Sequence, residues 1–194
     1  MIKPIVHKNL LKLYEETSKN KIINILFRYP EKEFSLSDLA KESCVAKANI
    51  GKILDEFQKD NLITIEKLSK IWRIKSNQTN WIFVKNKIAN NLSFIYRSGL
   101  VEFLVEHFKN PKVISLFGSF RKGEDISNSD IDIAIESDEI EEYKIIELKE
   151  LSEFEEIIGR RIEIHLFNRK NININLFNNI ANGIILWGFL EVKK

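Results

Sequence analysis

Hydrophobic residues in the first 60 positions recur at helical spacing and predict three short helices. The first covers residues 20–28 and ends before Pro30, which has no backbone N–H to continue it. Ser35 and Asp38 have the spacing of a capping box, so a second helix is expected from there to about residue 44. After a tight turn, a third helix carries an apolar face made of Ile50, Ile53, Leu54 and Phe57.

The pattern then changes from helical spacing to the alternation typical of strands. Residues 62–66 and 71–75 alternate apolar and polar side chains, and residues 67–70 separate them. This arrangement predicts a β-hairpin whose turn is basic. The net charge also differs between the two parts of the chain. Residues 1–80 hold 15 Lys and Arg against 10 Asp and Glu, whereas residues 81–194 hold 15 Lys and Arg against 18 Asp and Glu. The basic first part favours a polyanionic partner there.

Three helices followed by a basic hairpin resemble the winged helix-turn-helix family over residues 19–76. In that family the second helix of the turn motif enters the major groove of DNA and the hairpin contacts the backbone. The resemblance implies DNA contacts by Lys47, Asn49, Lys52, Lys67, Lys70 and Arg73. Winged helices also serve as modules for protein docking or dimerisation, so that alternative stays open.

The second part of the chain predicts strands and helices in mixed order. Two helices are expected over residues 83–97 and 99–109, before a continuous apolar strand at residues 112–117. A second strand follows at residues 130–135 and a third at residues 161–167. Between these two strands, residues 139–158 predict one long acidic helix that ends at Gly159. A last helix at residues 171–181 precedes an apolar segment at residues 184–187.

Two aspartates in the second of these strands are candidates for metal binding. Asp130 and Asp132 alternate with isoleucines, so both carboxylates are expected on one face. Neighbouring carboxylates repel each other unless a cation lies between them. Oxygen ligands favour a hard cation, which indicates Mg²⁺ or Mn²⁺. Ten residues separate Asp130 from Gly118 and Ser119, which end the apolar strand, where backbone N–H groups and a hydroxyl can hold phosphate oxygens.

The segment from Gly118 to Asp132 as a whole resembles the signature of the DNA polymerase β-like nucleotidyltransferases, and most closely their minimal nucleotidyltransferase branch. The resemblance covers residues 94–194. It implies that Asp130 and Asp132 bind two magnesium ions and that a third carboxylate on a later strand completes the site. The nucleotide triphosphate would be held by Gly118, Ser119, Arg121, Lys122 and Ser129.

The third carboxylate departs from the family pattern, because no Asp follows Asp138. Glu163 in the third strand is the expected substitute, and its longer side chain either fits or weakens the binding of the second metal. His165 shares the face of Glu163. We expect it to be an ordinary strand histidine, and contact with a substrate phosphate or leaving group is the alternative.

These patterns together predict an α/β (α+β) protein with two domains. Residues 1–78 would form the winged helix-turn-helix domain and residues 79–93 a helical connector. Residues 94–194 would form the nucleotidyltransferase domain, a mixed sheet flanked by helices.

The expected activity is transfer of a nucleoside monophosphate from a triphosphate, by default ATP, to an acceptor hydroxyl on protein or nucleic acid. Some members of the minimal branch add adenylate to a partner toxin protein, and a fused winged helix would make this chain a DNA-binding antitoxin. The alternative is a transcription regulator that senses a nucleotide with weak or no turnover. The sequence is compatible with a homodimer.

Composition narrows the classes of protein further. With 44% hydrophobic and 30% charged residues, the chain is expected to be folded and soluble. The single Cys44 excludes an internal disulfide and a cysteine-based zinc site, and three dispersed histidines add no such site. No apolar stretch reaches the roughly 18 residues of a membrane span, and the first residues lack a signal-peptide run. We therefore expect a cytoplasmic protein without a membrane partner.

Overall fold

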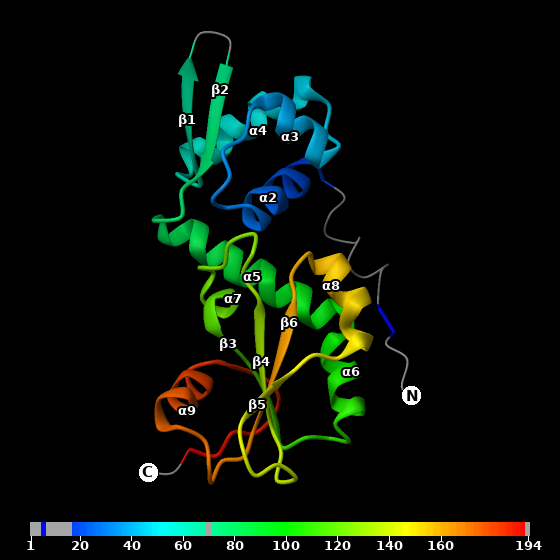
Figure 1. Ribbon diagram of the computed structural model, residues 1–194. Helices are drawn as coiled ribbons and strands as arrows, with labels where there is room; N and C mark the ends of the chain where they lie inside the picture. Colours follow the sequence, from blue (N-terminus) through cyan, green and yellow to red (C-terminus); the bar gives the residue numbers. More distant parts are fainter. Residues whose placement is uncertain (1–4, 7–16, 69–70, 193–194) are drawn as a thin grey trace. The chain divides into compact units, whose positions relative to one another are not determined.

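The computed structural model describes residues 5, 6, 17–68 and 71–192. These residues form two compact units, and the division between them falls after Asn90 (Figure 1). The dividing point lies inside the longest helix, α5 (Trp81–Ser98). Within the described part of the chain, no helix combines the length and the apolar character needed to cross a lipid bilayer.

The N-terminal unit contains the three helices and the hairpin that the sequence predicts. Its helices are α2 (Ser18–Arg28), α3 (Leu36–Ser43) and α4 (Lys47–Lys59). The predicted capping box is confirmed, because the side chains of Ser35 and Asp38 each accept a hydrogen bond from the other residue's backbone N–H. Strands β1 (Ile63–Leu68) and β2 (Ile71–Ser76) pair antiparallel.

One apolar core holds this unit together. Helices α2, α3 and α4 contribute Ile22, Leu26, Leu39, Ile50, Leu54 and Phe57, and the hairpin contributes Ile63 and Ile74. An isolated bridge between Phe34 and Ile74 attaches the segment before α3 to the hairpin. The buried positions are those that the helical and alternating patterns of the sequence place inward.

The C-terminal unit is built around a five-stranded mixed sheet. Its strands are β3 (Val113–Phe117), β4 (Ile131–Glu136), β5 (Lys144–Ile146), β6 (Ile162–Phe167) and β7 (Ile184–Gly188). They lie in the order β5-β6-β4-β3-β7. Strands β4 and β6 are parallel, whereas the other neighbours pair antiparallel. The mixed sheet flanked by helices agrees with the predicted α/β class.

The two faces of this sheet carry different side chains. One face is almost wholly aliphatic and packs against α6 (Leu100–His107) and α8 (Ser152–Ile158). The other face holds Phe117, Ala134 and Phe167 in a smaller core with α9 (Ile174–Ala181). Figure 1 shows α6 and α8 on one side of the sheet and α9 on the other. Asp132 alternates with Ile131 and Ile133 and therefore belongs to the α9 face.

The prediction of one long acidic helix over residues 139–158 is wrong. The structure has a turn, then strand β5, a 3-10 turn at Lys149–Leu151, and only the short helix α8. Strand β5 pairs with β6 and satisfies the backbone hydrogen-bonding groups along that edge of β6. This pairing outweighs the helical spacing of the apolar residues, which local sequence alone could not show.

Candidate metal and nucleotide site

Three polar side chains converge on the α9 face of the sheet, near the start of β4. Asp132 lies opposite Phe117 of β3 on one side and opposite Glu163 of β6 on the other. His165 is two residues after Glu163 and shares its face. The strand order therefore brings residues more than 30 positions apart into one group.

The ligand atoms of Asp132, Glu163 and His165 all lie within 4.8 Å of one another. The distance from His165 Nε2 to Asp132 Oδ1 is 3.2 Å, and that to Glu163 Oε2 is 3.9 Å. The side chains of Asp132 and Glu163 are 24% and 21% exposed, whereas that of His165 is only 7% exposed. The group is thus open to solvent from the carboxylate side and closed behind the imidazole.

A tyrosine orients the histidine from behind. The Tyr143 hydroxyl lies 2.6 Å from His165 Nδ1, and Phe117 packs edge-on against the imidazole at 4.8 Å between ring centroids. Burial raises the pKa of Tyr143, and the negative charges of Asp132 and Glu163 raise it further. The phenol therefore remains protonated at neutral pH and keeps its hydrogen bond to the ring.

Gly118 gives the Asp132 carboxylate the space that it occupies. A Cβ atom at position 118 would lie 1.9 Å from Asp132 Oδ2, so no side chain fits there. The φ angle of Gly118 is +73°, which also favours glycine. Gly118 was expected to help hold phosphate oxygens. The structure shows a second reason for glycine at this position, which is the close approach of the Asp132 carboxylate.

The other residues of the Gly118–Asp132 segment surround this group in different ways. Residues Gly118–Lys122 form the short helix α7, and Asp130 directly precedes β4. Asp130 is not one of the three residues whose ligand atoms meet, although the sequence placed it on the same strand face as Asp132. Ser129 Oγ accepts a hydrogen bond from the backbone N–H of Ile126, at 3.0 Å, and so closes the turn before Asp130.

Sequence reasoning missed Asp125, which holds this loop in place. Asp125 and Arg160 are 2% and 3% exposed, and Arg160 Nη2 lies 3.4 Å from Asp125 Oδ2. Asn91 of α5 donates to Asp125 Oδ1 at 3.0 Å and to the Phe120 carbonyl at 2.9 Å. The Arg160 guanidinium also donates to the Ser127 carbonyl at 3.1 Å. Nothing in the spacing of the segment distinguishes Asp125 from a solvated carboxylate.

Asp125→Asn is expected to destabilise the C-terminal unit by about 2 kcal/mol, because a buried guanidinium loses its charged partner. Urea unfolding of the full chain measures this effect. The matched control is Asp138→Asn, an exposed ion pair with Lys112 that should cost little. Equal midpoints for the two variants would contradict the role given to Asp125.

Tyr143 and the position of His165 were also not anticipated. The sequence placed Tyr143 in the long helix and treated His165 as an ordinary strand histidine. Their hydrogen bond depends on strand β5 forming beside β6, and Ile145 of β5 is the register partner of His165. The one available signal was the shared face of Glu163 and His165, which the structure confirms.

The basic residues proposed for DNA binding lie in the N-terminal unit. Lys47, Asn49 and Lys52 are exposed on α4, and the Lys47 ammonium donates to Ser37 Oγ at 2.9 Å. Arg73 on β2 forms ion pairs with Glu33 and Glu66. Lys67 is exposed and lies 4.1 Å from the centre of the Trp72 ring. Lys70 lies outside the described residues.

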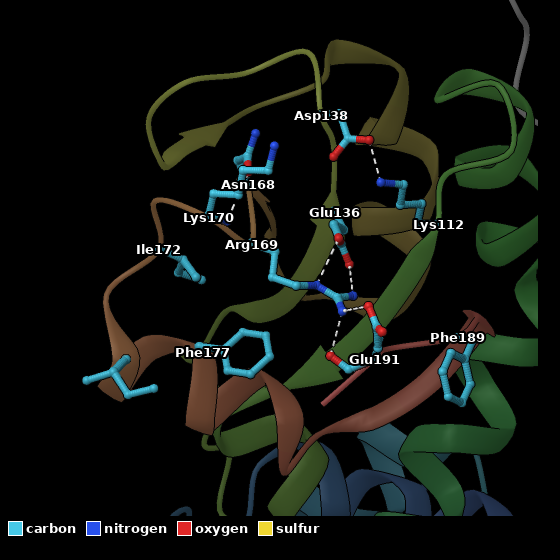
Figure 2. Close-up of a pocket in the computed structure, with 11 residues that line it drawn as sticks. Lys112, Glu136, Asp138, Asn168, Arg169, Lys170, Ile172, Phe177, Phe189 and Glu191 are labelled. Atoms are coloured by element: carbon cyan, nitrogen blue, oxygen red, sulfur yellow. Dashed lines mark hydrogen bonds and ion pairs between the residues drawn. The ribbon is translucent and has the colours of Figure 1, made fainter. Parts of the chain in front are cut away.

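A separate pocket of about 870 Å³ occupies the other end of the α9 face. Figure 2 shows Arg169 at its centre, bonded to the buried Glu136 and to Glu191. Glu136 is four residues beyond Asp132 along β4, or about 13 Å. Three cationic and three anionic side chains line this pocket, so their formal charges sum to zero, and its apolar wall is formed by Ile172, Ile174, Phe177 and Phe189.

One of three comparisons with known proteins agrees with the geometry of the C-terminal unit. Neither the curated proteins nor the solved structures gave a match to this chain. A comparison with family models did give one, and it covers the sheet, Gly118, Asp132 and Glu163. Residues 99–188 match the model described as polymerase beta, nucleotidyltransferase, which supports a polymerase β-like nucleotidyltransferase domain in this part of the chain.

Proposed function

We propose that the protein is a metal-dependent nucleotidyltransferase that moves a nucleoside monophosphate from a triphosphate, by default ATP, to an acceptor hydroxyl. The observation that carries the proposal is the meeting of Asp132 and Glu163 beside Gly118, inside the region that matches the nucleotidyltransferase family. Proteins of this family typically use a divalent metal. Two carboxylates on adjacent strands fit that need, since without a cation their charges oppose each other.

The triphosphate would lie against α7, next to the carboxylates. Ser119 follows Gly118 at the start of this helix, and Arg121 and Lys122 bring two positive charges to it. Arg121 Nε is buried and has no hydrogen-bond partner within the described part of the chain. Backbone N–H groups, a hydroxyl and cationic side chains are the donors that phosphate oxygens accept from.

In the proposed reaction, the acceptor oxygen attacks the α-phosphorus and forms a new P–O bond. The bond between the α-phosphorus and the oxygen bridging to the β-phosphorus breaks, and pyrophosphate leaves with that electron pair. The hydroxyl proton passes to solvent or to a carboxylate at the site. Mg²⁺ bound by Asp132 and Glu163, with Asp130 as an additional expected ligand, would acidify the hydroxyl and neutralise charge on pyrophosphate. Ser119 and Arg121 would keep the phosphates in line for displacement.

The test uses ATP labelled in either the α- or the γ-phosphate, with purified protein, a divalent metal and cell extract as the source of acceptors. Nucleotidyl transfer moves the α-label and leaves the γ-label in pyrophosphate, whereas a kinase would do the reverse. Protease and nuclease treatment then identify the acceptor as protein or nucleic acid, and the other three nucleoside triphosphates test base preference. A partner toxin protein is the proteinaceous acceptor that the proposal favours.

A nucleotide-sensing regulator is the competing function, and the same assay separates the two. Equilibrium binding of ATP with metal but no transfer of the α-label from any of the four nucleotides would support the sensor. The departure of Glu163 from the family's usual aspartate is the feature that favours the sensor. The approach of Glu163 to Asp132 and His165 supports a working metal site instead.

We also propose that residues 1–78 form a winged helix-turn-helix domain that binds duplex DNA, followed by a helical connector over residues 79–93 and the transferase domain over residues 94–194. Three helices followed by an antiparallel hairpin support this proposal. So do the exposed Lys47, Asn49 and Lys52 along α4.

Binding to duplex DNA should be weak and should fall steeply with salt, because each phosphate contact releases a counterion. Lys52→Ala is expected to reduce the slope of log affinity against log salt by about 1. Fluorescence anisotropy of the full chain with a labelled duplex measures both quantities. Lys149→Ala in the C-terminal unit is the matched control and should change neither. Absence of binding at low salt would favour a protein-docking role for this unit.

A further inference from the structure

His165 is the one buried member of the candidate metal group, and the reaction proposed above assigns it no task. Its side chain is 7% exposed and comes from the same strand as Glu163. The ring is held by Phe117 on one face and by the Tyr143 hydroxyl at Nδ1. The opposite nitrogen, Nε2, is therefore the atom that faces both carboxylates.

The spacing of these atoms matches a set of metal ligands. Metal–ligand bonds of roughly 2.1 Å place neighbouring ligands of one cation about 3.0 to 3.4 Å apart in octahedral or tetrahedral geometry. His165 Nε2 lies 3.2 Å from Asp132 Oδ1 and 3.9 Å from Glu163 Oε2. The Glu163 side chain is 21% exposed, and a shift of its carboxylate toward His165 would bring all three atoms to one centre.

Tyr143 supplies the support that a metal-binding histidine requires. When Nε2 binds a metal, Nδ1 carries the proton and needs an acceptor, which in metal sites fixes the ring and its tautomer. The Tyr143 oxygen is 2.6 Å from Nδ1 and serves as that acceptor. Without metal, the same pair allows the reverse arrangement, in which Tyr143 donates to Nδ1 and Nε2–H donates to Asp132.

We propose that His165 Nε2 is a protein ligand of this site, in addition to the carboxylates, and that it makes the site selective for a first-row transition-metal dication over Mg²⁺. This inference rests on the proposed function in taking Asp132 and Glu163 as the cation site. Mg²⁺ takes oxygen ligands and gives up its water reluctantly, whereas transition metals accept imidazole readily. An imidazole nitrogen in place of an oxygen ligand therefore lowers the affinity of the site for Mg²⁺ relative to its affinity for transition-metal dications.

Mn²⁺ is the probe of choice, because carboxylate ligands suit it as they suit Mg²⁺ and the free ion is detected by its paramagnetic signal. Electron paramagnetic resonance of free Mn²⁺ in solutions of the full chain gives the affinity, and competition with Mg²⁺ gives the selectivity. The wild type should bind Mn²⁺ more tightly than Mg²⁺. His165→Asn, which offers an amide oxygen, should lower the Mn²⁺/Mg²⁺ affinity ratio by about tenfold or more.

His107→Asn in α6 is the matched control and should leave the ratio unchanged. Because His165 is buried, Tyr143→Phe provides a second, milder variant that removes only the hydroxyl behind the ring. It should weaken Mn²⁺ binding by about tenfold, with a smaller effect on Mg²⁺. A wild-type ratio near one, or an unchanged ratio in both variants, overturns the inference.

The metal measurements and the labelling assay test the two proposals independently, so one proposal can be refuted while the other stands. Transfer of the α-label together with a ratio that ignores His165 would refute the ligand role and leave the transferase standing. A ratio that depends on His165 without any transfer would support the ligand role and refute the transferase.

Discussion

Asp132→Asn is expected to reduce nucleotidyl transfer by roughly a thousandfold or more, because the site loses the charged group at its centre. Asp132 is the residue that touches every part of the site, since Oδ1 is 3.2 Å from His165, Oδ2 lies against Gly118, and Glu163 is its register partner. Asparagine has the same shape but cannot offset the charge of a dication. The substitution also removes a repulsion with Glu163, so thermal stability without metal should be equal or slightly higher.

The measurement is the initial rate of pyrophosphate release from ATP with Mn²⁺ or Mg²⁺, together with thermal unfolding of the same preparations. Asp138→Asn is an isosteric change of an exposed carboxylate in the same unit, and it should retain the wild-type rate. If Asp132→Asn keeps a tenth or more of the wild-type rate, the chemistry takes place elsewhere in the molecule.

Glu163→Gln should lower turnover by roughly a hundredfold or more while binding of ATP persists. The amide keeps the length and packing of Glu163 but removes the second charge that, in the proposed function, would hold the cation and assist deprotonation of the acceptor. In the proposed function the triphosphate is held mainly by α7 and Asp132, so its affinity should change far less than the rate. Rate and affinity measured on one preparation therefore distinguish a catalytic defect from a folding defect.

Glu147, which shares the ion-pair partner Arg161 with Glu163, provides a matched control. The Arg161 guanidinium lies 3.8 Å from Glu163 Oε1 and also pairs with the exposed Glu147. Glu147→Gln removes a charge from the same arginine without touching the cluster and should leave turnover unchanged. Turnover that survives Glu163→Gln would move the third carboxylate to another residue.

Glu163→Asp asks whether the site has adapted to the longer side chain. The aspartate is one methylene shorter, so its oxygens would lie about one bond length farther from the centre. The present geometry brings Glu163 to 3.9 Å from His165, which favours adaptation to glutamate. We therefore expect the aspartate variant to be slower than the wild type, and a faster variant would show that Glu163 is a defect.

Local sequence patterns determined much of the secondary structure. The alternation around Asp132 predicted which side chains of β4 face the aliphatic core, and the Ser35–Asp38 pair predicted the start of α3. Gly118, Asp132 and Glu163 could be chosen as site residues from the motif and from strand alternation alone. These signals are readable because they arise between neighbours within a few residues, where backbone geometry fixes the spacing.

Pairing between distant segments was decided only by the tertiary structure. The parallel pairing of β4 and β6 sets Asp132 beside Glu163, and the antiparallel β5 brings Tyr143 to His165. The same holds for the buried pair of Asp125 and Arg160, which are 35 residues apart. The residues next to a position in the sequence do not indicate such distant partners, because the partners meet only when the strands have taken their order in the sheet.

The failure of the long acidic helix has the same physical origin. Over residues 139–158 the apolar side chains fit a helix, and no proline interrupts them. In the folded chain the edge of β6 offers backbone donors and acceptors to Lys144–Ile146, and burial of Tyr143 against His165 adds packing there. By itself, then, the sequence determined the elements whose causes are local, together with the Gly118–Asp132 motif. The strand order, and with it the meeting of Asp132, Glu163 and His165 in the candidate metal group, depended on contacts that exist only after the sheet has formed.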